Sequence, residues 1–383
     1  MNAIDLFSGV GGLSLGAARA GFNIAAAIEI DPFAIATHNI NFPKSRHFME
    51  DVSTINGQEL LNSIGLSHLD CLIGGPPCQG FSSIGKGEVF DKRNELYLHF
   101  FRLISEIQPS FFLAENVPGI MNAKYENIRA EAFNLIQNEY HILRPLKIKA
   151  SEFGAPTTRT RIFFIGFKKE LGTNVLTPEN FSVPEHISQI TVADALSGID
   201  FDIDPLWQEE ADGWRVITKQ INKGPFFEKL WGEIPPNVGS QIAVERLEKN
   251  LVSGFLGTRH SDLVEERYSK LKFGEVDKIS RSMRLDPNGF CPTLRAGTAR
   301  DKGSYQAVRP IHPYLPRVIS PREAARLQGF PDWFQFHSTK WHSFRQIGNS
   351  VSPIVAEAML LPIANACSKI NQNCTLENHG IAL

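Results

Sequence analysis

Residues 74–86 read Gly-Gly-Pro-Pro-Cys-Gln-Gly-Phe-Ser-Ser-Ile-Gly-Lys, and this stretch decides the fold around it. The apolar run 71–73 before it has the length of a strand and stops at a pair of glycines. In α/β enzymes such a strand ends at the carboxyl edge of the sheet, where ligands bind. Pro76 and Pro77 fix two φ angles and lack N–H donors, so neither a helix nor a strand ladder continues through Cys78. The stretch predicts an α/β fold with one thiol at the sheet edge where ligands bind, followed by a loop with glycine hinges. A cysteine that only packs in a core would not need these prolines and glycines beside it.

The composition is that of an intracellular globular protein. A chain of 383 residues with 42% apolar content can form one large core and a smaller domain. A net charge of -2 neither supports nor excludes nucleic acid, since any binding surface would be a local cleft. The five cysteines show no CxxC pair, which favours a reducing compartment over a disulfide or zinc framework. The chain starts directly with a strand-like run and has no apolar stretch of membrane-spanning length, so we expect a cytosolic, soluble protein.

Short apolar runs alternate with helical segments over the first hundred-odd residues. We expect strands at 3–7, 24–28, 70–74 and 110–115, and helices from Gly12, from Pro32 and over 96–107. This alternation predicts a parallel sheet covered by helices. Two later runs, 146–150 and 161–167, are expected to be antiparallel neighbours that close the sheet.

The pattern changes after Pro184, where periodicity becomes sparse, so we expect a second domain over about 186–316. Within it, 281–310 carries six Lys or Arg against two Asp, which fits either a polyanion contact or a solvated basic face. Helical signals return at Ser320-Pro-Arg-Glu323, a capping box with Pro at the first helical position. A last helix is expected over 350–367, capped by Ser350 or Ser352.

A glycine-rich turn between the first strand and the first helix, residues 5–16, predicts a ligand close to the backbone. Ser14 stands where a dinucleotide fingerprint needs glycine, which argues against a pyrophosphate. Glu29 ends the second strand and can accept hydrogen bonds from both hydroxyls of a ribose, and Asp51 can accept one from the amine of adenine. The turn and the two acids suggest an adenosine without a diphosphate, the alternative being that both acids are solvated strand ends.

The same edge is expected to carry Glu115, which ends the buried run 111–114. Arg159 and Arg161 open another strand and share one face because they are two residues apart. Considered alone, a glutamate at a strand end or an arginine on a strand is more often exposed to solvent than part of a site. Together with Cys78 they predict a pocket containing a thiol, a carboxyl and a guanidinium.

With these residues in place, the chain resembles the DNA (cytosine-5)-methyltransferases. The resemblance covers nearly the whole chain in the family's order, and its two most specific motifs are Pro-Pro-Cys-Gln-Gly-Phe-Ser and Gln-Ile-Gly-Asn-Ser-Val. The matching segments are 5–16, 29–31, Asp51, 74–86, 115–117, 159–161, 317–332 and 346–353. Two positions depart from the family pattern, Thr157 and Glu50, and neither would take part in bond chemistry.

The resemblance implies a class I S-adenosylmethionine-dependent methyltransferase with a Rossmann-like, mixed but mostly parallel sheet. Residues 1–185 would form the catalytic domain, 186–316 a smaller, irregular target-recognition domain, and 317–383 a return segment whose last helix packs beside the first strand. It implies S-adenosylmethionine as cofactor and no metal ion. The residues implied to bind the cofactor are Phe7, Gly9, Gly11, Glu29, Ile30, Asp51, Val52, Pro76, Leu96, Asn349, Ser350 and Val351.

The chemistry of cytosine methylation needs these side chains. Carbon 5 is a poor nucleophile, so the Cys78 thiolate would first add to carbon 6, and a cation such as Arg161 would favour the anion. A protonated Glu115 would hydrogen-bond ring nitrogen 3, while Arg161 would hold the carbonyl at carbon 2 and Arg159 would orient its neighbours. The base that removes the carbon 5 proton is not named by the sequence.

A stacked cytosine cannot be attacked, so the target nucleotide has to swing out of the duplex. The loop 80–87 would act as a lid, and Gln79, Ser82, Lys86 and Arg93 are the candidates to contact the DNA around the gap. For each of them a mobile solvated loop is the alternative. Base-reading contacts are expected within about 254–300.

Other functions share parts of this pattern. A tRNA cytosine-5 methyltransferase has the same catalytic set, although the long variable region favours DNA. A catalytically idle DNA- or adenosine-binding module would not need Cys78, Glu115 and Arg161, and a nucleotide-dependent oxidoreductase is disfavoured by Ser14. By analogy we expect a monomer in the bacterial cytosol, associated with the nucleoid, that protects host DNA in a restriction system and is paired with an endonuclease.

Overall fold

The computed structural model describes residues 1–77, 95–199, 202–209, 211, 213–219, 224–296 and 309–379, with side chains up to 372. Its main sheet has eight strands in the order β3-β2-β1-β4-β5-β8-β6, and β7 pairs with β8 off this path. The strands are β1 Asn2–Leu6, β2 Asn23–Ile28, β3 Arg46–Phe48, β4 Cys71–Gly74, β5 Phe111–Asn116, β6 Tyr140–Ile142, β7 Leu146–Lys149 and β8 Thr160–Lys168. The pairs from β3 to β5 are parallel, whereas β8 runs antiparallel to β5, β6 and β7. The mixed sheet, closed by an antiparallel pair, confirms the predicted fold class.

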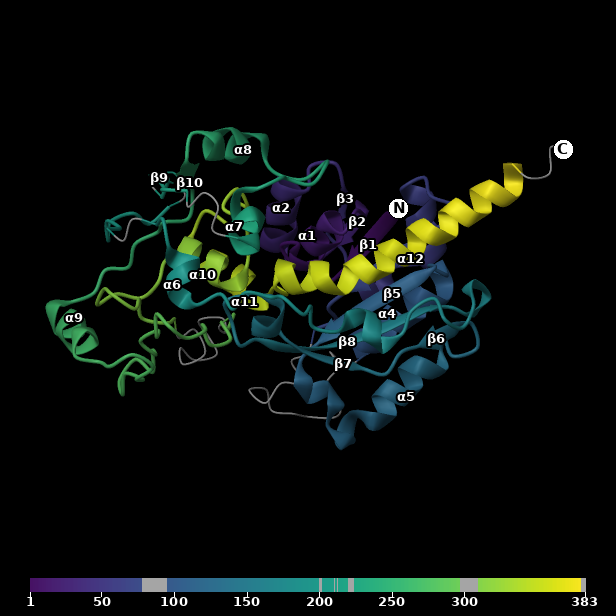
Figure 1. The fold of residues 1–383 in the computed structure, drawn as a ribbon, viewed down its shortest axis with the longest axis horizontal. Helices are drawn as coiled ribbons and strands as arrows, with labels where there is room; N and C mark the ends of the chain where they lie inside the picture. The colour runs from purple at the N-terminus through teal and green to yellow at the C-terminus, as the bar shows by residue number, and fades with distance from the viewer. Residues whose placement is uncertain are drawn as a thin grey trace.

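Alternate residues of the strands pack into two separate hydrophobic cores, one on each face of the sheet. Ala3, Cys71 and Phe111 belong to one core, and their neighbours Ile4, Leu72 and Phe112 belong to the other. The second core is covered by α3 (Gly57–Ser63), α4 (Glu95–Ile107) and α5 (Glu126–Asn134). The first is covered by α1 (Gly12–Arg19), α2 (Pro32–Asn41) and α12 (Pro353–His379) (Figure 1). The strands are therefore buried on both faces, which explains their continuous apolar runs.

The return of the chain to its beginning rests on close packing between α1 and α12 (Figure 1). Gly16 makes this possible, because a Cβ there would lie 2.3 Å from the Cβ of Ala356 and 2.5 Å from the backbone N of Glu357. Farther along α12, the Ser368 hydroxyl lies 3.6 Å from the sulfur of Met1, just before β1. Both ends of the chain thus complete the same core.

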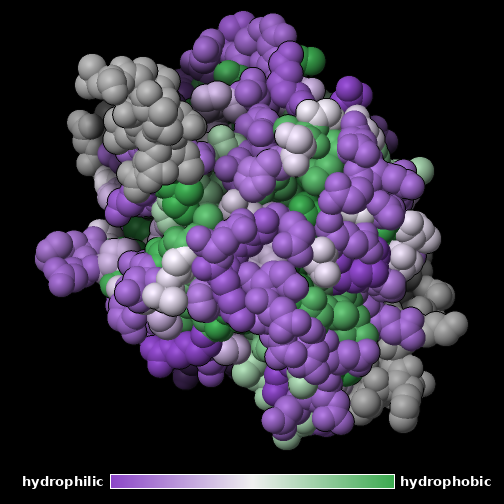
Figure 2. Space-filling model, turned by 90° about the vertical axis from the view of Figure 1, so that its right-hand side faces the viewer, coloured by the Kyte–Doolittle hydropathy of each residue, from purple (hydrophilic) through white to green (hydrophobic). Residues whose placement is uncertain are grey.

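One prediction about membranes needs correction. The helical stretch Lys340–Gln372 is long and apolar enough to cross a membrane, although the sequence was expected to contain no such stretch. In the most apolar part of that stretch 67% of the residues are buried inside the protein, as expected for a core helix. The face shown in Figure 2, on the right-hand side of the view in Figure 1, is mainly hydrophilic with hydrophobic areas between the hydrophilic residues.

The region 186–316 is built of short elements, which Figure 1 shows at the end of the molecule away from the sheet. They are α6 Val192–Leu196, β9 Arg215–Val216, α7 Pro225–Trp231, α8 Gln241–Glu248, β10 Leu251–Val252 and α9 Asp262–Ser269. The two-residue strands β9 and β10 pair with each other. The irregular texture agrees with the sparse periodicity of the sequence, and the domain boundaries stay a prediction. Single 3-10 turns lie elsewhere, at η1 Val52–Thr54, η3 Pro118–Met121, η4 Ala123–Tyr125, η5 Ala150–Phe153, η6 Lys169–Leu171 and η7 Pro178–Phe181.

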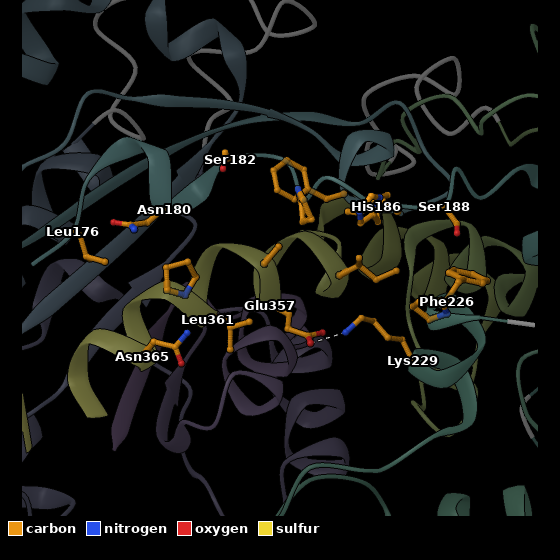
Figure 3. A pocket seen from close by; sticks show the side chains of 18 of the residues that line it. Leu176, Asn180, Ser182, His186, Ser188, Phe226, Lys229, Glu357, Leu361 and Asn365 are labelled. Atoms are coloured by element: carbon orange, nitrogen blue, oxygen red, sulfur yellow. Dashed lines mark hydrogen bonds and ion pairs between the residues drawn. The ribbon is translucent and has the colours of Figure 1, made fainter. Parts of the chain in front are cut away.

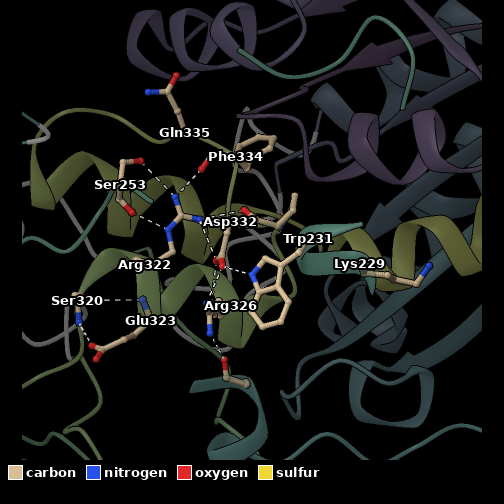
Figure 4. A network of polar contacts seen from close by, with 12 residues as sticks. Lys229, Trp231, Ser253, Ser320, Arg322, Glu323, Arg326, Asp332, Phe334 and Gln335 are labelled. Atoms are coloured by element: carbon tan, nitrogen blue, oxygen red, sulfur yellow. Dashed lines mark hydrogen bonds and ion pairs between the residues drawn. The ribbon is translucent and has the colours of Figure 1, made fainter. Parts of the chain in front are cut away.

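Helix α10 (Pro321–Gln328) begins with the predicted capping box: Ser320 accepts from the N–H of Glu323, whose carboxylate accepts from the N–H of Ser320. The helix is fully buried and carries two buried arginines (Figure 4). Arg326 binds both carboxylate oxygens of Asp332, at 2.9 and 2.7 Å, and the carbonyl of Ser197 at 2.8 Å. Arg322 binds the carbonyls of Ser253, Pro331 and Phe334. These bonds tie the variable region to the return segment.

The end of the chain differs from the prediction in two respects. A helix, α11 (Lys340–Asn349), stands before the last one, and α12 extends well beyond 367 to His379. Neither predicted serine caps α12 with its side chain. The Ser350 hydroxyl donates to the carbonyl of Gln346 at 2.8 Å and so closes α11, while the Ser352 hydroxyl has no partner among the described residues.

Candidate active site

A cavity of about 400 Å³ opens where β1, β2, β4 and β5 end. Its wall is formed by the loops after these strands together with the end of α11. The volume lies within the range of small-molecule sites. The carboxyl edge of the sheet is where the sequence predicted a ligand.

Glu29 is the most strongly held acid of this cavity. Its Oε2 accepts from the N–H of Gly9, and its Oε1 accepts from the N–H groups of Ile30 and Asp31, each at 2.9 Å. Burial raises the pKa of Glu29, and the N–H groups of Asp31 and Gly9 oppose this rise. Three backbone donors therefore hold the carboxylate in one orientation before any ligand arrives.

The turn after β1 uses its glycines for close approach. Gly9 has a φ of 55° and no atom within 4 Å of an ideal Cβ, so its open side can face a ligand. A Cβ on Gly12 would lie 2.4 Å from the carbonyl oxygen of Val351, which brings the return segment onto the turn. Even Phe7 has a positive φ, 57°. The turn is thus open toward the cavity at Gly9 and packed against the return segment at Gly12.

The predicted cofactor residues lie together with one exception. Those that line the cavity are Phe7, Gly9, Glu29, Ile30, Asp51, Val52, Pro76, Leu96, Asn349, Ser350 and Val351. Gly11 does not line it, because its Cβ position points at the ring of Phe42, 2.4 Å away. Asp51 caps η1 with Oδ1, which accepts from the N–H of Ser53 at 2.9 Å. Its second oxygen has no hydrogen-bond partner within the described part of the chain.

A buried polar chain runs beneath the turn and was not predicted. The Ser14 hydroxyl lies 2.6 Å from Asp5 Oδ2 and 2.9 Å from His38 Nε2, and His38 Nδ1 lies 2.9 Å from His47 Nε2. Burial raises the pKa of Asp5 to about 7 and lowers that of His38 well below its usual value. Ser14 therefore has a structural task that explains why glycine does not stand there.

Glu115 and Arg161 meet at the cavity wall. The Nε of Arg161 lies 2.6 Å from Glu115 Oε1, and both side chains are mostly buried. Gly75 allows the strand-end loop to pass close by, because a Cβ there would lie 3.3 Å from Glu115 Oε2. The Asn116 amide donates to the carbonyl of Pro76 at 3.4 Å. The predicted carboxyl and guanidinium are thus paired beside the loop that leads to Cys78.

Arg159 precedes β8 and is 4% exposed. Its guanidinium donates to the carbonyls of Leu294, Gly348 and Asn349 at 3.3, 3.0 and 3.4 Å. These carbonyls come from the variable region and from the end of α11. Arg159 lines the cavity and also joins three parts of the chain, and its orienting role stays a prediction.

Cys78, Gln79, Ser82, Lys86 and Arg93 lie outside the described residues, and the described chain reaches Pro77 on the cavity wall. Among the described cysteines, Cys71, Cys291 and Cys367 are free and buried. Burial raises the pKa of Cys367 to about 12 and raises those of the other two thiols as well. A buried thiol of raised pKa is a poor nucleophile, so none of these three competes with Cys78 for that task.

Several cavity residues were missed by sequence reasoning. Phe33, His342 and Arg345 line the wall, and Arg345 pairs with Asp31 at 2.8 Å. Gln346, inside a matched motif, donates to Thr37 Oγ1 at 2.9 Å. Their contacts cross from α2 to α11, and no local pattern reveals such pairs. Within the described ranges no three His, Cys, Asp or Glu side chains gather to hold a metal ion.

A larger cavity, about 590 Å³, lies along α12 (Figure 3). Its wall is mainly apolar, with the ion pair of Lys229 and Glu357 at 2.5 Å on one side. Among the residues that the structure describes, no predicted catalytic or cofactor residue lines this cavity. Volume alone therefore does not identify the reactive site.

Comparisons with known proteins establish the family of the chain. The family model of the C-5 cytosine-specific DNA methylases matches residues 1–365. The chain is 40% identical to the type II methyltransferase M.XorII of Xanthomonas oryzae over 374 residues, 96% of this chain and 85% of that protein. It is 32% identical to the type II methyltransferase M.DdeI of Desulfomicrobium norvegicum, over 97% of this chain and 90% of that protein.

Solved structures show the same fold. A DNA modification methyltransferase encoded within an E. coli prophage matches with a TM-score of 0.87 and 58% identity, over 96% of this chain and 99% of that chain. The S. pombe Dnmt2 methyltransferase matches with a TM-score of 0.62 at 16% identity, over 97% and 99% of the two chains, and supports the fold alone. By its sequence motifs, its sheet and these matches, the chain belongs to the C-5 cytosine-specific DNA methylases.

Proposed function

We propose that the protein transfers the methyl group of S-adenosylmethionine to carbon 5 of a flipped-out cytosine in one short duplex DNA sequence, through a transient bond between Cys78 and carbon 6. The observation that carries this proposal is a single cavity that contains both a preorganised acid for a ribose, Glu29, and the Glu115–Arg161 pair, 2.6 Å apart, for a pyrimidine. A module that only bound adenosine would not need the Glu115–Arg161 pair.

The cavity fits S-adenosylmethionine by the chemistry of its walls. Glu29 would accept from the ribose hydroxyls, the free oxygen of Asp51 would accept from the adenine amine, and Ile30, 63% exposed, would cover the adenine ring. The turn at Gly9 and the segment Asn349–Val351 would enclose the methionine part. When bound, the cofactor supplies an electrophilic methyl group on a sulfonium.

The chain's own groups then act on the cytosine. Cys78, which follows Pro77 in the sequence, would add to carbon 6, and the guanidinium of Arg161 would favour its thiolate. Glu115 would hydrogen-bond nitrogen 3, and Arg161 would hydrogen-bond the oxygen on carbon 2. Both bonds would stabilise the negative charge that the thiolate's attack places on the ring. Arg159 would hold the end of α11 and the segment of the variable region around Leu294 in position, because its guanidinium donates hydrogen bonds to both. After methyl transfer, loss of the carbon 5 proton releases Cys78.

Duplex DNA is the proposed partner, since the family is defined by action on DNA. Residues 1–185 and 317–383 would form the catalytic domain and 186–316 the part that reads sequence, with bases contacted from about 254–300. Gln79, Ser82, Lys86 and Arg93 would contact the strand around the flipped base.

Relatives named as type II methyltransferases support a biological role in restriction-modification. We propose that the protein acts as a monomer in the bacterial cytosol, at the nucleoid, where it protects host DNA from a paired endonuclease. Sequencing of bisulfite-treated DNA from cells that express the chain tests both the activity and the motif. We expect 5-methylcytosine at one short motif, lost in Cys78→Ala; scattered methylation, or methylation of tRNA instead of DNA, would refute the proposal.

A further inference from the structure

Helix α11 has two functional faces. Lys340 and Phe344, four residues apart, share a side of the helix that does not line the cavity. The residues of α11 that line the cavity include His342, Arg345, Gly348 and Asn349. The side with Lys340 meets the variable region. The Nζ of Lys340 donates to the carbonyl of Gly257 and, at 3.1 Å, to Thr258 Oγ1. A Cβ on Gly348 would lie 2.6 Å from the N of Ala296. Because Gly348 also lines the cavity, the junction between α11 and the variable region borders the cavity.

Arg309 lies on the side of α11 that carries Phe344. Its guanidinium carbon is 4.1 Å from the ring centroid of Phe344, a cation–π contact, and the residue is half-buried. In the part of the chain that the structure describes, Arg309 has neither an ion pair nor a hydrogen-bond acceptor. Burial lowers the pKa of Arg309 to about 10, so the side chain still carries its charge at neutral pH.

Lys340 is a second cation close to Arg309. Burial and then the charge of Arg309 lower the pKa of Lys340 to about 8, so the two groups lie within each other's field. The partners of Lys340 are neutral: the carbonyl of Gly257, Thr258 and the amide oxygen of Gln208 at 3.5 Å. Two half-buried cations with no carboxylate among the described residues repel each other, and an anion between them would relieve this repulsion.

We propose that Arg309, held flat on Phe344 and supported by the charge of Lys340, binds a phosphodiester group of the DNA strand that carries the target cytosine. Stacking uses the face of the guanidinium and leaves its N–H edge for two parallel bonds to a phosphate. A strand whose base enters the cavity would pass the junction of α11 with the variable region, because Gly348 of α11 both lines the cavity and packs against Ala296. The inference rests on the proposed function and extends it to one phosphate site.

The test is DNA binding by Arg309→Gln, measured by fluorescence anisotropy with a labelled duplex at several salt concentrations. We expect affinity to fall roughly tenfold or more. The slope of log affinity against log salt should fall in magnitude by about 0.9, because one fewer phosphate is neutralised. Specific and unrelated duplexes should lose affinity alike, since a phosphate contact carries no sequence information. Cofactor affinity by calorimetry should not change.

Two variants serve as controls. Lys369→Gln removes an exposed charge from α12, outside the region proposed to read DNA, and should leave the slope as in the wild type. Equal losses in Lys369→Gln and Arg309→Gln would indicate a general effect of positive charge and overturn the proposal. Arg309→Lys keeps the charge without the planar edge, so the slope should be retained while affinity falls in part; full affinity in Arg309→Lys would overturn the bidentate site. A wild-type protein that neither binds nor methylates DNA refutes the proposed function, whereas normal wild-type methylation with an unchanged Arg309→Gln slope refutes this inference alone.

Discussion

The buried pair of Arg326 and Asp332 gives the sharpest stability prediction. Both side chains are fully inaccessible, and Asp332 also accepts from the indole N–H of Trp231 at 2.6 Å and lies 3.9 Å from Arg322. Asp332→Asn keeps the shape but removes the only carboxylate that faces two buried arginines among the described residues. Removing one partner of a buried pair costs about 3–5 kcal/mol because the other charge is left uncompensated.

Since asparagine keeps one oxygen for Arg326 or for Trp231, we expect the lower end, about 3 kcal/mol. Thermal unfolding followed by calorimetry or circular dichroism should show a fall in Tm of roughly 4 °C. The matched control is Glu266→Gln on α9, where Glu266 and Lys270 are 2.6 Å apart but 60% and 71% exposed. Such a pair is screened by water, so its loss should change the free energy of unfolding very little. Similar losses in Asp332→Asn and Glu266→Gln would refute the argument that burial makes the difference.

Three further predictions concern the cofactor edge and the core. Glu29→Gln should weaken cofactor binding in calorimetry roughly tenfold or more, because a charged acceptor is lost, while Glu59→Gln, on the exposed side of α3, should not. Burial raises the pKa of Asp5 to about 7, above its value in the unfolded chain. Below pH 4 the carboxyl is protonated in both states and does not change the free energy of unfolding, whereas between pH 4 and pH 7 it lowers that free energy increasingly. Asp5→Asn should therefore gain roughly 2–3 kcal/mol relative to the wild type between pH 5 and pH 8 in urea titrations, and a constant difference would contradict the assignment. Gly16→Ala should destabilise by roughly 1–3 kcal/mol through overpacking, with partial relief from Ala356→Gly, and no loss in Tm would show that α1 and α12 can separate freely.

Sequence reasoning succeeded where local pattern and topology act together. The strands that end before Phe7, Glu29, Gly75 and Val117 were recognised as apolar runs, and parallel strands bring their ends to one edge. The capping box at Ser320 was predicted residue by residue, because its bonds span only three positions.

The failures come from long-range contacts. Helix α11 contains a glycine and little apolar periodicity, and it is fixed by contacts on two sides, such as Gln346 with Thr37. The partners of Arg159, at 294, 348 and 349, cannot be inferred from its neighbours in sequence. Ser14 suggested only the lack of a dinucleotide site, and its hydrogen bonds to Asp5 and His38 depend on how the first two helices pack.

The central claim is that Cys78 bonds covalently to the cytosine that becomes methylated. The most direct measurement incubates the protein with S-adenosylmethionine and a duplex in which 5-fluorocytosine replaces the target base, since fluorine cannot leave as a proton does. We predict a complex that survives denaturing electrophoresis and has the summed mass of protein, DNA and one methyl group, and that is absent with Cys78→Ala. A wild-type protein that methylates the ordinary duplex but gives no such complex would contradict the account.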